Sequence, residues 1–143
     1  MASTTFKSLV DTTFDSVEGY RKAAEKANSP QLKQQLEERG MQRERTLATL
    51  NNELERQGDE LVTKGTFTGT AHRVWTDITD AFENGDEAAA ERVEEGEDYI
   101  SKKFEEALED DNLQPEERQI VQQCYAEICE GERFGDMIEN QHD

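Results

Sequence analysis

Hydrophobic residues recur every three or four positions along four long segments of the chain, a spacing that is typical of amphipathic helices. The first segment covers about residues 4–27 and the second about residues 30–57. Ser29 is a suitable N-cap for the second helix, and Pro30 a suitable first helical residue. Because only two or three residues separate the two segments, they are predicted to form an antiparallel hairpin.

A second pair of long helices is predicted at about residues 86–109 and 115–140. The crossover between the two pairs, residues 58–85, starts with glycine and threonine and contains a shorter apolar repeat at about residues 70–83. Two helical hairpins joined by a long crossover have the connectivity of ferritin-like bundles. We therefore expect one all-α domain over residues 1–143, a ferritin-like antiparallel four-helix bundle with a short extra helix in the crossover.

Details of the two C-terminal helices can also be predicted from the pattern. Asp86 precedes the third long helix and is expected to be its N-cap. In the fourth long helix, the apolar stripe that is expected to face the core includes Phe134, Met137 and Ile138.

Each long segment carries a glycine near its middle, where glycine costs about 1 kcal/mol relative to alanine in a helix. These glycines are Gly19, Gly40, Gly96 and Gly131. The midpoints of antiparallel helices lie at the same height in a bundle, so the glycines are expected to form one layer. Small residues in this layer either let helices approach closely or make room for bulky polar groups.

The apolar stripe of the second helix passes through Arg43, with Arg39 beside it. An arginine at a core position needs carboxylates around it, because a buried unpaired charge is costly. Tyr20 and Tyr99 are expected to reach the same polar layer with their hydroxyl groups. One interpretation of the layer is therefore a structural ion-pair network centred on Arg43.

A bound metal ion is the alternative interpretation of the same layer. Its expected ligands are the glutamates near the helix midpoints, namely Glu18, Glu44, Glu94, Glu97, Glu127 and Glu130. An all-oxygen site suits calcium, magnesium or manganese, and iron enters by analogy with ferritin-like di-iron proteins. Those proteins use Glu-x-x-His pairs, whereas the two histidines here, His72 and His142, belong to no such pair.

Charge is distributed unevenly along the chain, which has a net charge of −18. Residues 1–65 carry 11 acidic and 10 basic side chains, whereas residues 66–143 carry 23 acidic and 6 basic ones. This balance excludes binding to a nucleic-acid backbone and favours cations or a basic protein partner. No apolar stretch reaches the roughly 20 residues of a membrane span, and no signal-peptide pattern is present, so we expect a cytoplasmic protein without membrane contact.

Several segments resemble those of a family of uncharacterised bacterial four-helix-bundle proteins in the ferritin-like superfamily, a domain-of-unknown-function family. These segments are GYRKAAE in the first helix, QRERTLATLNNELERQG in the second, GTFTGTAHRVW in the crossover, EEGEDYISKKFEEAL in the third and QCYAEI in the fourth. The resemblance covers nearly the whole chain. It implies the fold but no established activity.

Neither a catalytic triad nor a phosphate-binding loop can be identified in the sequence. We therefore expect a non-enzymatic, stress-associated protein that acts by self-association, such as a homodimer, or by protein binding. The crossover helix is expected to pack Val74, Trp75 and Ile78 onto the bundle, with His72 hydrogen-bonded to nearby backbone. The alternative is that His72, Arg73 and Trp75 form a subunit interface. The alternatives are a carboxylate-rich iron- or manganese-binding protein with oxidase-type chemistry, and an acidic protein that binds a basic partner through residues 86–143.

Overall fold

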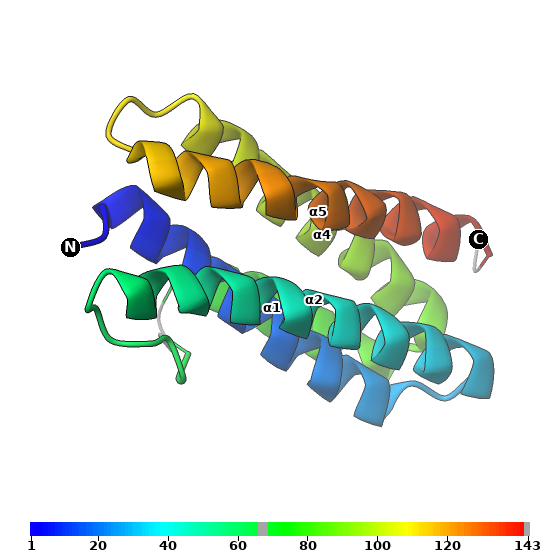
Figure 1. Cartoon of the computed structure of the whole chain (residues 1–143). Coiled ribbons are helices and arrows are strands. Elements are labelled where there is room, and N and C mark those ends of the chain that lie inside the picture. Colours follow the sequence, from blue (N-terminus) through cyan, green and yellow to red (C-terminus); the bar gives the residue numbers. More distant parts are fainter. Residues whose placement is uncertain (66–68, 142–143) are drawn as a thin grey trace.

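The computed structural model describes residues 1–65 and 69–141, and every regular element in these residues is helical, as predicted. Figure 1 shows the long helices lying side by side. The helices are α1 (Thr4–Lys26), α2 (Pro30–Arg56), α3 (Thr70–Ala81), α4 (Asp86–Leu108) and α5 (Pro115–Gln141), and a 3₁₀ turn, η1 (Phe82–Asn84), follows α3. The ends of the four long helices lie within one residue of the sequence prediction.

α1 and α2 form an antiparallel hairpin with a short turn (Figure 1). Ser29 caps α2, because its side chain accepts a hydrogen bond from the backbone of Leu32, and Pro30 is the first helical residue. Asp86 lies beside the same turn and accepts hydrogen bonds from the backbone N–H groups of Asn28 and Ser29, at 3.0 and 2.8 Å. The prediction that Asp86 is an N-cap is therefore wrong, since Gly85 holds that position and Asp86 joins the start of α4 to the first hairpin.

α4 and α5 form the second antiparallel hairpin, and α5 also packs against α2. The linker of residues 109–114 is held by Leu113, which is buried, and by Arg118 of α5. The guanidinium of Arg118 donates hydrogen bonds to the carbonyl groups of Leu108 and Asp110. These contacts satisfy acceptors that the end of a helix leaves without a partner.

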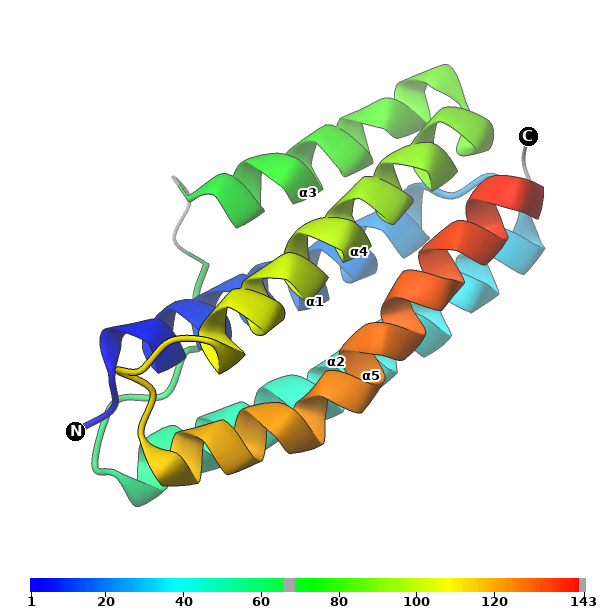
Figure 2. The same cartoon turned by 90° about the horizontal axis from the view of Figure 1, so that it is seen from above.

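α3 packs against α1 and α4, outside the square of long helices (Figure 2). Its apolar face, which contains Ala71, Trp75 and Ile78, is buried. The crossover therefore adds a fifth packed helix, and five helices share the core. Among the described residues, no helix combines the length and the apolar character that crossing a membrane requires.

The apolar core consists of two clusters of buried side chains. One cluster, around Phe6, Leu50 and Phe104, lies toward the end of the bundle that holds the α4–α5 linker. The other, around Leu32, Trp75 and Ile138, lies toward the α1–α2 turn. The prediction that Met137 faces the core is wrong, because its side chain is 42% exposed. Met137 lies one position before the buried Ile138 on α5 and therefore projects outward.

Candidate functional site

Arg43 lies at the centre of the bundle and its side chain is completely buried. It comes from α2, where Leu36 and Leu50, one on either side along the helix, are also fully buried. Its guanidinium donates to both carboxylate oxygens of Glu97 on α4, from Nη2 at 3.1 and 2.8 Å. A third hydrogen bond runs from Nη1 to the hydroxyl of Ser16 on α1, at 3.2 Å. Three helices are therefore joined through one side chain.

Glu127 of α5 completes the pairing of Arg43. Its carboxylate accepts hydrogen bonds from Arg43 Nε at 2.9 and 3.2 Å and from the hydroxyl of Thr46 at 2.7 Å. Arg39, one helical turn before Arg43, also donates a hydrogen bond to this carboxylate, and only 7% of its side chain is exposed. Glu130 lies at the edge of the group, 4.0 Å from Arg39. We call Arg39, Arg43, Glu97, Glu127 and Tyr20 the buried polar layer.

Tyr20 of α1 joins this layer to the second apolar cluster. Its hydroxyl donates a hydrogen bond to Glu97, and the guanidinium carbon of Arg43 lies 5.7 Å from the centre of its ring. The ring also contacts Trp75 of α3, with ring centres 4.7 Å apart and planes inclined by 52°. The packing of α3 therefore reaches the buried polar layer through one aromatic residue.

The mid-helix glycines make room for two different groups. A Cβ atom on Gly131 would overlap the Glu97 carboxylate, so this glycine makes room for the ion pair. A Cβ atom on Gly19 would overlap the indole of Trp75, and one on Gly96 would lie 2.8 Å from Ile78 Cδ1. Two of the four glycines therefore let α3 approach closely, one of the two roles predicted for them, although the sequence pattern did not identify α3 as the helix that approaches.

The buried polar layer is electrically balanced, with two arginines facing two glutamates. Burial opposes the charged form of Arg43, but Glu97 and Glu127 outweigh it and hold the pKa of Arg43 above its ordinary value. Burial would raise the pKa of Glu127, but Arg43 and Thr46 hold it below its usual range. Burial, followed by the charge of Glu97, raises the pKa of Tyr20 well above normal. The layer therefore contains three ion-pair contacts, Arg39–Glu127, Arg43–Glu97 and Arg43–Glu127, and a phenol that stays protonated at neutral pH.

The chemistry of this layer does not fit a metal centre. Each carboxylate oxygen of Glu97 and Glu127 already accepts at least one hydrogen bond from a guanidinium group. Arg43 stays charged at every accessible pH and would place a positive group in the first coordination shell of any cation bound there. The arrangement instead holds four helices at a fixed register.

The structure distributes the six glutamates that were predicted as metal ligands over several places. Glu97 and Glu127 lie in the buried polar layer, with Glu130 at its edge. Glu18 pairs with Arg21 at 2.6 Å, and Glu44 is exposed on the outer side of α2. These two lie outside the layer because their helical positions point away from the core.

Glu94 lies on a different surface, between α4 and α5. Its carboxylate and those of Asp136 and Glu139 have oxygen atoms within 4.8 Å of one another. Burial, followed by the charges of Glu139 and Asp136, raises the pKa of Glu94. Further along the same seam, burial and a hydrogen bond with Asp98 raise the pKa of Glu132. We call these five acidic residues the α4–α5 acidic seam.

Tyr99 lies outside the buried polar layer, in contrast to the prediction. It is half-buried on the outer side of α4, where the ammonium of Lys103 lies 5.6 Å from the centre of its ring. It borders a surface hollow between α3 and α4 with Val74 and Lys102. Tyr99 lies three residues after Gly96 and two after Glu97 on α4. The rotation of the helix between Glu97 and Tyr99 turns the Tyr99 side chain away from the core.

The three residues predicted as an interface are divided between the core and the surface. Trp75 is 3% exposed, because it fills the space that Gly19 and Gly96 leave between α1 and α4. Arg73 is exposed, and His72 is half-buried. Trp75 therefore packs within the chain. The second histidine, His142, lies outside the described residues.

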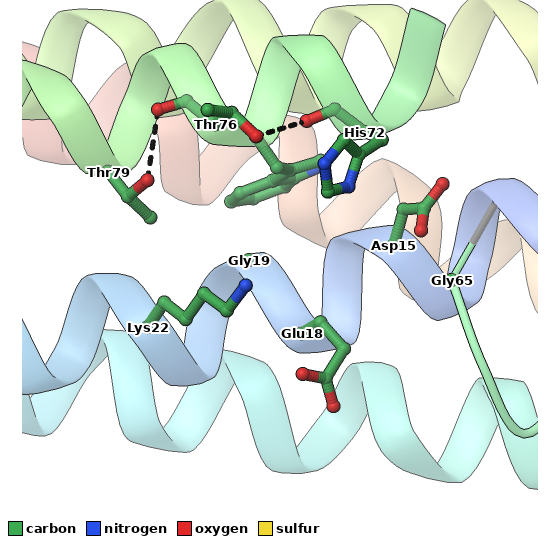
Figure 3. A pocket seen from close by; sticks show the side chains of 9 residues that line it. Asp15, Glu18, Gly19, Lys22, Gly65, His72, Thr76 and Thr79 are labelled. Atoms are coloured by element: carbon green, nitrogen blue, oxygen red, sulfur yellow. Dashed lines mark hydrogen bonds between the residues drawn. The ribbon is translucent and has the colours of Figure 1, made fainter. Parts of the chain in front are cut away.

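His72 borders a small cavity of about 70 Å³ between α1 and α3, shown in Figure 3. Asp15 and Lys22 of α1 lie on the opposite wall, with Thr76 and Thr79 on α3. Asp15 is buried, and burial raises its pKa although the nearby His72 lowers it in part. The cavity is large enough for water and too small for an organic ligand.

Sequence reasoning missed Glu117, a completely buried carboxylate near the start of α5. It accepts hydrogen bonds from the backbone and hydroxyl of Ser3, at 3.0 and 2.7 Å, and from the side chain of Gln57, at 3.1 Å. The backbone of Gln114 donates to it at 3.0 Å. A glutamate at the third position of a helix that begins with Pro115 is the signal that could have identified this cap.

Comparison with known proteins gives one match. Residues 1–110 match the model of a family described as "Domain of unknown function (DUF2383)". No curated protein and no solved structure matches the chain.

Proposed function

The chain belongs to the DUF2383 family of domains of unknown function, and we propose that it is a non-enzymatic, ferritin-like helical bundle that binds a basic protein partner. Support for the ferritin-like part comes from connectivity. The long crossover leads from the end of α2 to the start of α4 and joins two antiparallel hairpins, as it does in ferritin-like bundles.

The buried polar layer supports a non-enzymatic role. In ferritin-like di-iron proteins, carboxylates and histidines of the bundle core hold the metal. Here Arg43 and Arg39 neutralise Glu97 and Glu127, so neither carboxylate of the buried polar layer is left as a base, a nucleophile or a ligand. The proposed function therefore depends on the surface of the bundle rather than on its core.

The difference between the paired charges of the buried polar layer and the crowded acids of the surface is the observation that supports a basic partner. The two acids of the buried polar layer are paired with arginine. Those of the α4–α5 acidic seam crowd one another, and burial and neighbouring acids raise the pKa of Glu94. Residues 66–143 contain 23 acidic and 6 basic side chains. A surface of one sign attracts partners of the opposite sign and accelerates their association.

Binding of a basic globular protein tests this proposal, with egg-white lysozyme as the probe. The test variant is Glu94→Gln with Asp136→Asn and Glu139→Gln, and the matched control, Glu38→Gln with Glu55→Gln and Glu60→Gln, removes the same charge from exposed sites before residue 66. We expect wild type and control to bind at low salt and to lose affinity as salt rises, and the test variant to bind at least severalfold more weakly. Equal affinities for the two variants would contradict a role for the seam.

A second candidate function is cation binding at the same seam. The observation that favours it is the trio Glu94, Asp136 and Glu139, whose oxygen atoms lie within 4.8 Å of one another. An all-oxygen set of this kind suits calcium, magnesium or manganese. Elemental analysis of protein purified without chelators or a histidine tag checks this candidate, and a stoichiometric metal lost from the Glu94→Gln triple variant would support it.

A further inference from the structure

A groove of about 430 Å³ runs along the outer side of the first hairpin, between α1 and α2. Val17 and Ala24 of α1 and Met41 of α2 contribute its apolar wall, and Tyr20 and Leu36 lie beneath them. Four large hydrophobic side chains are exposed among the described residues, and Met41, at 54%, is the one of these that lines this groove. The volume lies within the range of ligand-binding pockets.

Gly40 determines the shape of this α1–α2 groove. A Cβ atom on Gly40 would lie 3.2 Å from Tyr20 Cβ, so the two helices approach closely at this point. Because residue 40 has no side chain, Met41 is the exposed apolar side chain that α2 contributes to the wall. The floor is firm, because Tyr20 is fully buried and donates a hydrogen bond to Glu97.

The rim of the groove is acidic. Four acidic side chains and two basic ones line it, namely Glu18, Glu25, Glu37, Glu44, Arg21 and Lys33. Arg21 is occupied within the chain, because it forms ion pairs with Glu18 at 2.6 Å and with Glu25 at 3.4 Å. Glu37 and Glu44 form no ion pair with any described residue, so their charges are available to a partner.

We propose that the α1–α2 groove binds an amphipathic helix of a basic partner protein. Apolar residues of that helix pack against Val17 and Met41, and its lysine or arginine residues lie next to Glu37 and Glu44. The inference rests on the proposed function, because it names a second contact surface for the same class of partner. A groove that accepts apolar side chains at helical spacing is a recurrent mode of peptide recognition.

The dimensions fit a short helix. On α2 the groove extends from Lys33 to Glu44, which corresponds to about 16 Å at 1.5 Å per residue. Three turns of a partner helix cover this length and present apolar residues at i, i+4 and i+7.

Charge argues for a basic partner and against a second copy of this chain. The rim has two more acids than bases, and the whole chain has a net charge of −18. A second copy in the groove would bring like charges together, which weakens association. A basic helix would instead replace that repulsion with ion pairs.

Two fluorescent 14-residue peptides of leucine and lysine test the proposal. In one, the leucines recur at helical spacing on a single face, and in the other the same residues are scrambled so that no apolar face forms. Fluorescence anisotropy at 0.15 M salt measures the affinity of each. The variants are Met41→Asp, Glu37→Gln with Glu44→Gln, and Met137→Asp, which places the same change at an exposed methionine outside the groove.

We expect wild-type protein to bind the amphipathic peptide about tenfold more tightly than the scrambled one. Met41→Asp should abolish this preference although it adds a charge that attracts lysine, and Met137→Asp should retain it. Glu37→Gln with Glu44→Gln should weaken binding of the amphipathic peptide severalfold. Circular dichroism confirms that each variant is folded.

Four results would overturn the inference. The first is equal affinity of the wild-type protein for the two peptides. If the triple variant Glu94→Gln, Asp136→Asn and Glu139→Gln then binds both peptides more weakly, the proposed function stands while the groove has no role. The second is an unchanged preference in Met41→Asp. The third is a wild-type dimer that Met41→Asp dissociates in sedimentation experiments, which would make the second copy the occupant. Failure of both peptides to bind would contradict the proposed function as well.

Discussion

Arg43 and Glu97 face each other across the core, joined by two hydrogen bonds of 2.8 and 3.1 Å, and neither side chain is exposed to solvent. Removing water from two charges is costly, and their attraction compensates only when the remaining polar atoms also find partners. Ser16, Tyr20 and Glu127 are those partners. The pair therefore fixes which faces of α1, α2, α4 and α5 meet.

Removing one member of this pair should destabilise the protein strongly. We expect Arg43→Leu to lower the free energy of unfolding by about 3–5 kcal/mol, because Glu97 is left buried and unpaired. The double variant Arg43→Leu with Glu97→Leu should recover much of this loss, since Arg39 still pairs with Glu127. Urea unfolding of the two single variants and the double variant measures the coupling. Additive losses would show that the two residues do not act as a pair.

Gly19→Ala should displace α3. Alanine is better than glycine in a helix by about 1 kcal/mol, but its Cβ atom would overlap the indole of Trp75. Trp75 is the one tryptophan in the sequence, so tryptophan fluorescence reports on the packing around this ring. We expect emission to shift to longer wavelength as water reaches the ring. Gly135→Ala is the control, because the atoms nearest to its Cβ belong to Glu94, and unchanged emission in Gly19→Ala would contradict the packing.

Glu117→Ala should loosen one end of the bundle. The variant leaves donors from Ser3, Gln57 and Gln114 without their acceptor, and an unsatisfied buried polar group costs about 1–3 kcal/mol. Amide hydrogen exchange should increase first at the starts of α1 and α5. Glu116→Ala, at the exposed neighbouring position, should change stability by less than about 0.5 kcal/mol. Equal effects at the two positions would contradict the role of Glu117.

Stability should change with pH in two opposite ways. The pKa of Glu127 is lower in the folded protein than its ordinary value of 4.5, so its contribution is fully present above that value and is lost as pH falls through the folded pKa. The pKa values of Glu94 and Glu132 are raised, so their charged forms destabilise the fold as pH rises above 4.5.

We therefore expect stability to increase on mild acidification from pH 7 toward pH 5 and to fall below about pH 4. Thermal unfolding across this range measures both limbs of the stability profile, the upper limb between pH 5 and pH 7 and the lower limb below about pH 4. Glu94→Gln with Glu132→Gln should flatten the upper limb and leave the lower one, whereas Glu127→Gln should reduce the lower limb. A profile that the first variant leaves unchanged would contradict repulsion in the α4–α5 acidic seam.

The sequence by itself determined the helices, the two hairpins and the presence of an arginine in the core. These features follow from local physics, because apolar spacing, Ser29 with Pro30 at a helix start and the position of Arg43 on an apolar stripe can be read without knowing any distant contact. The halves of the chain also differ in charge, and this too is visible in the sequence.

Only the tertiary structure decided which acids meet Arg43 and what the glycines accommodate. Glu94 and Glu97 lie three residues apart on α4, yet one faces the seam and the other the core, and a rotation of the helix by less than one residue would exchange them. That rotation depends on α3, because Trp75 fits against Gly19 and Gly96. Contacts between segments far apart in sequence set helix rotation, and local spacing cannot specify them.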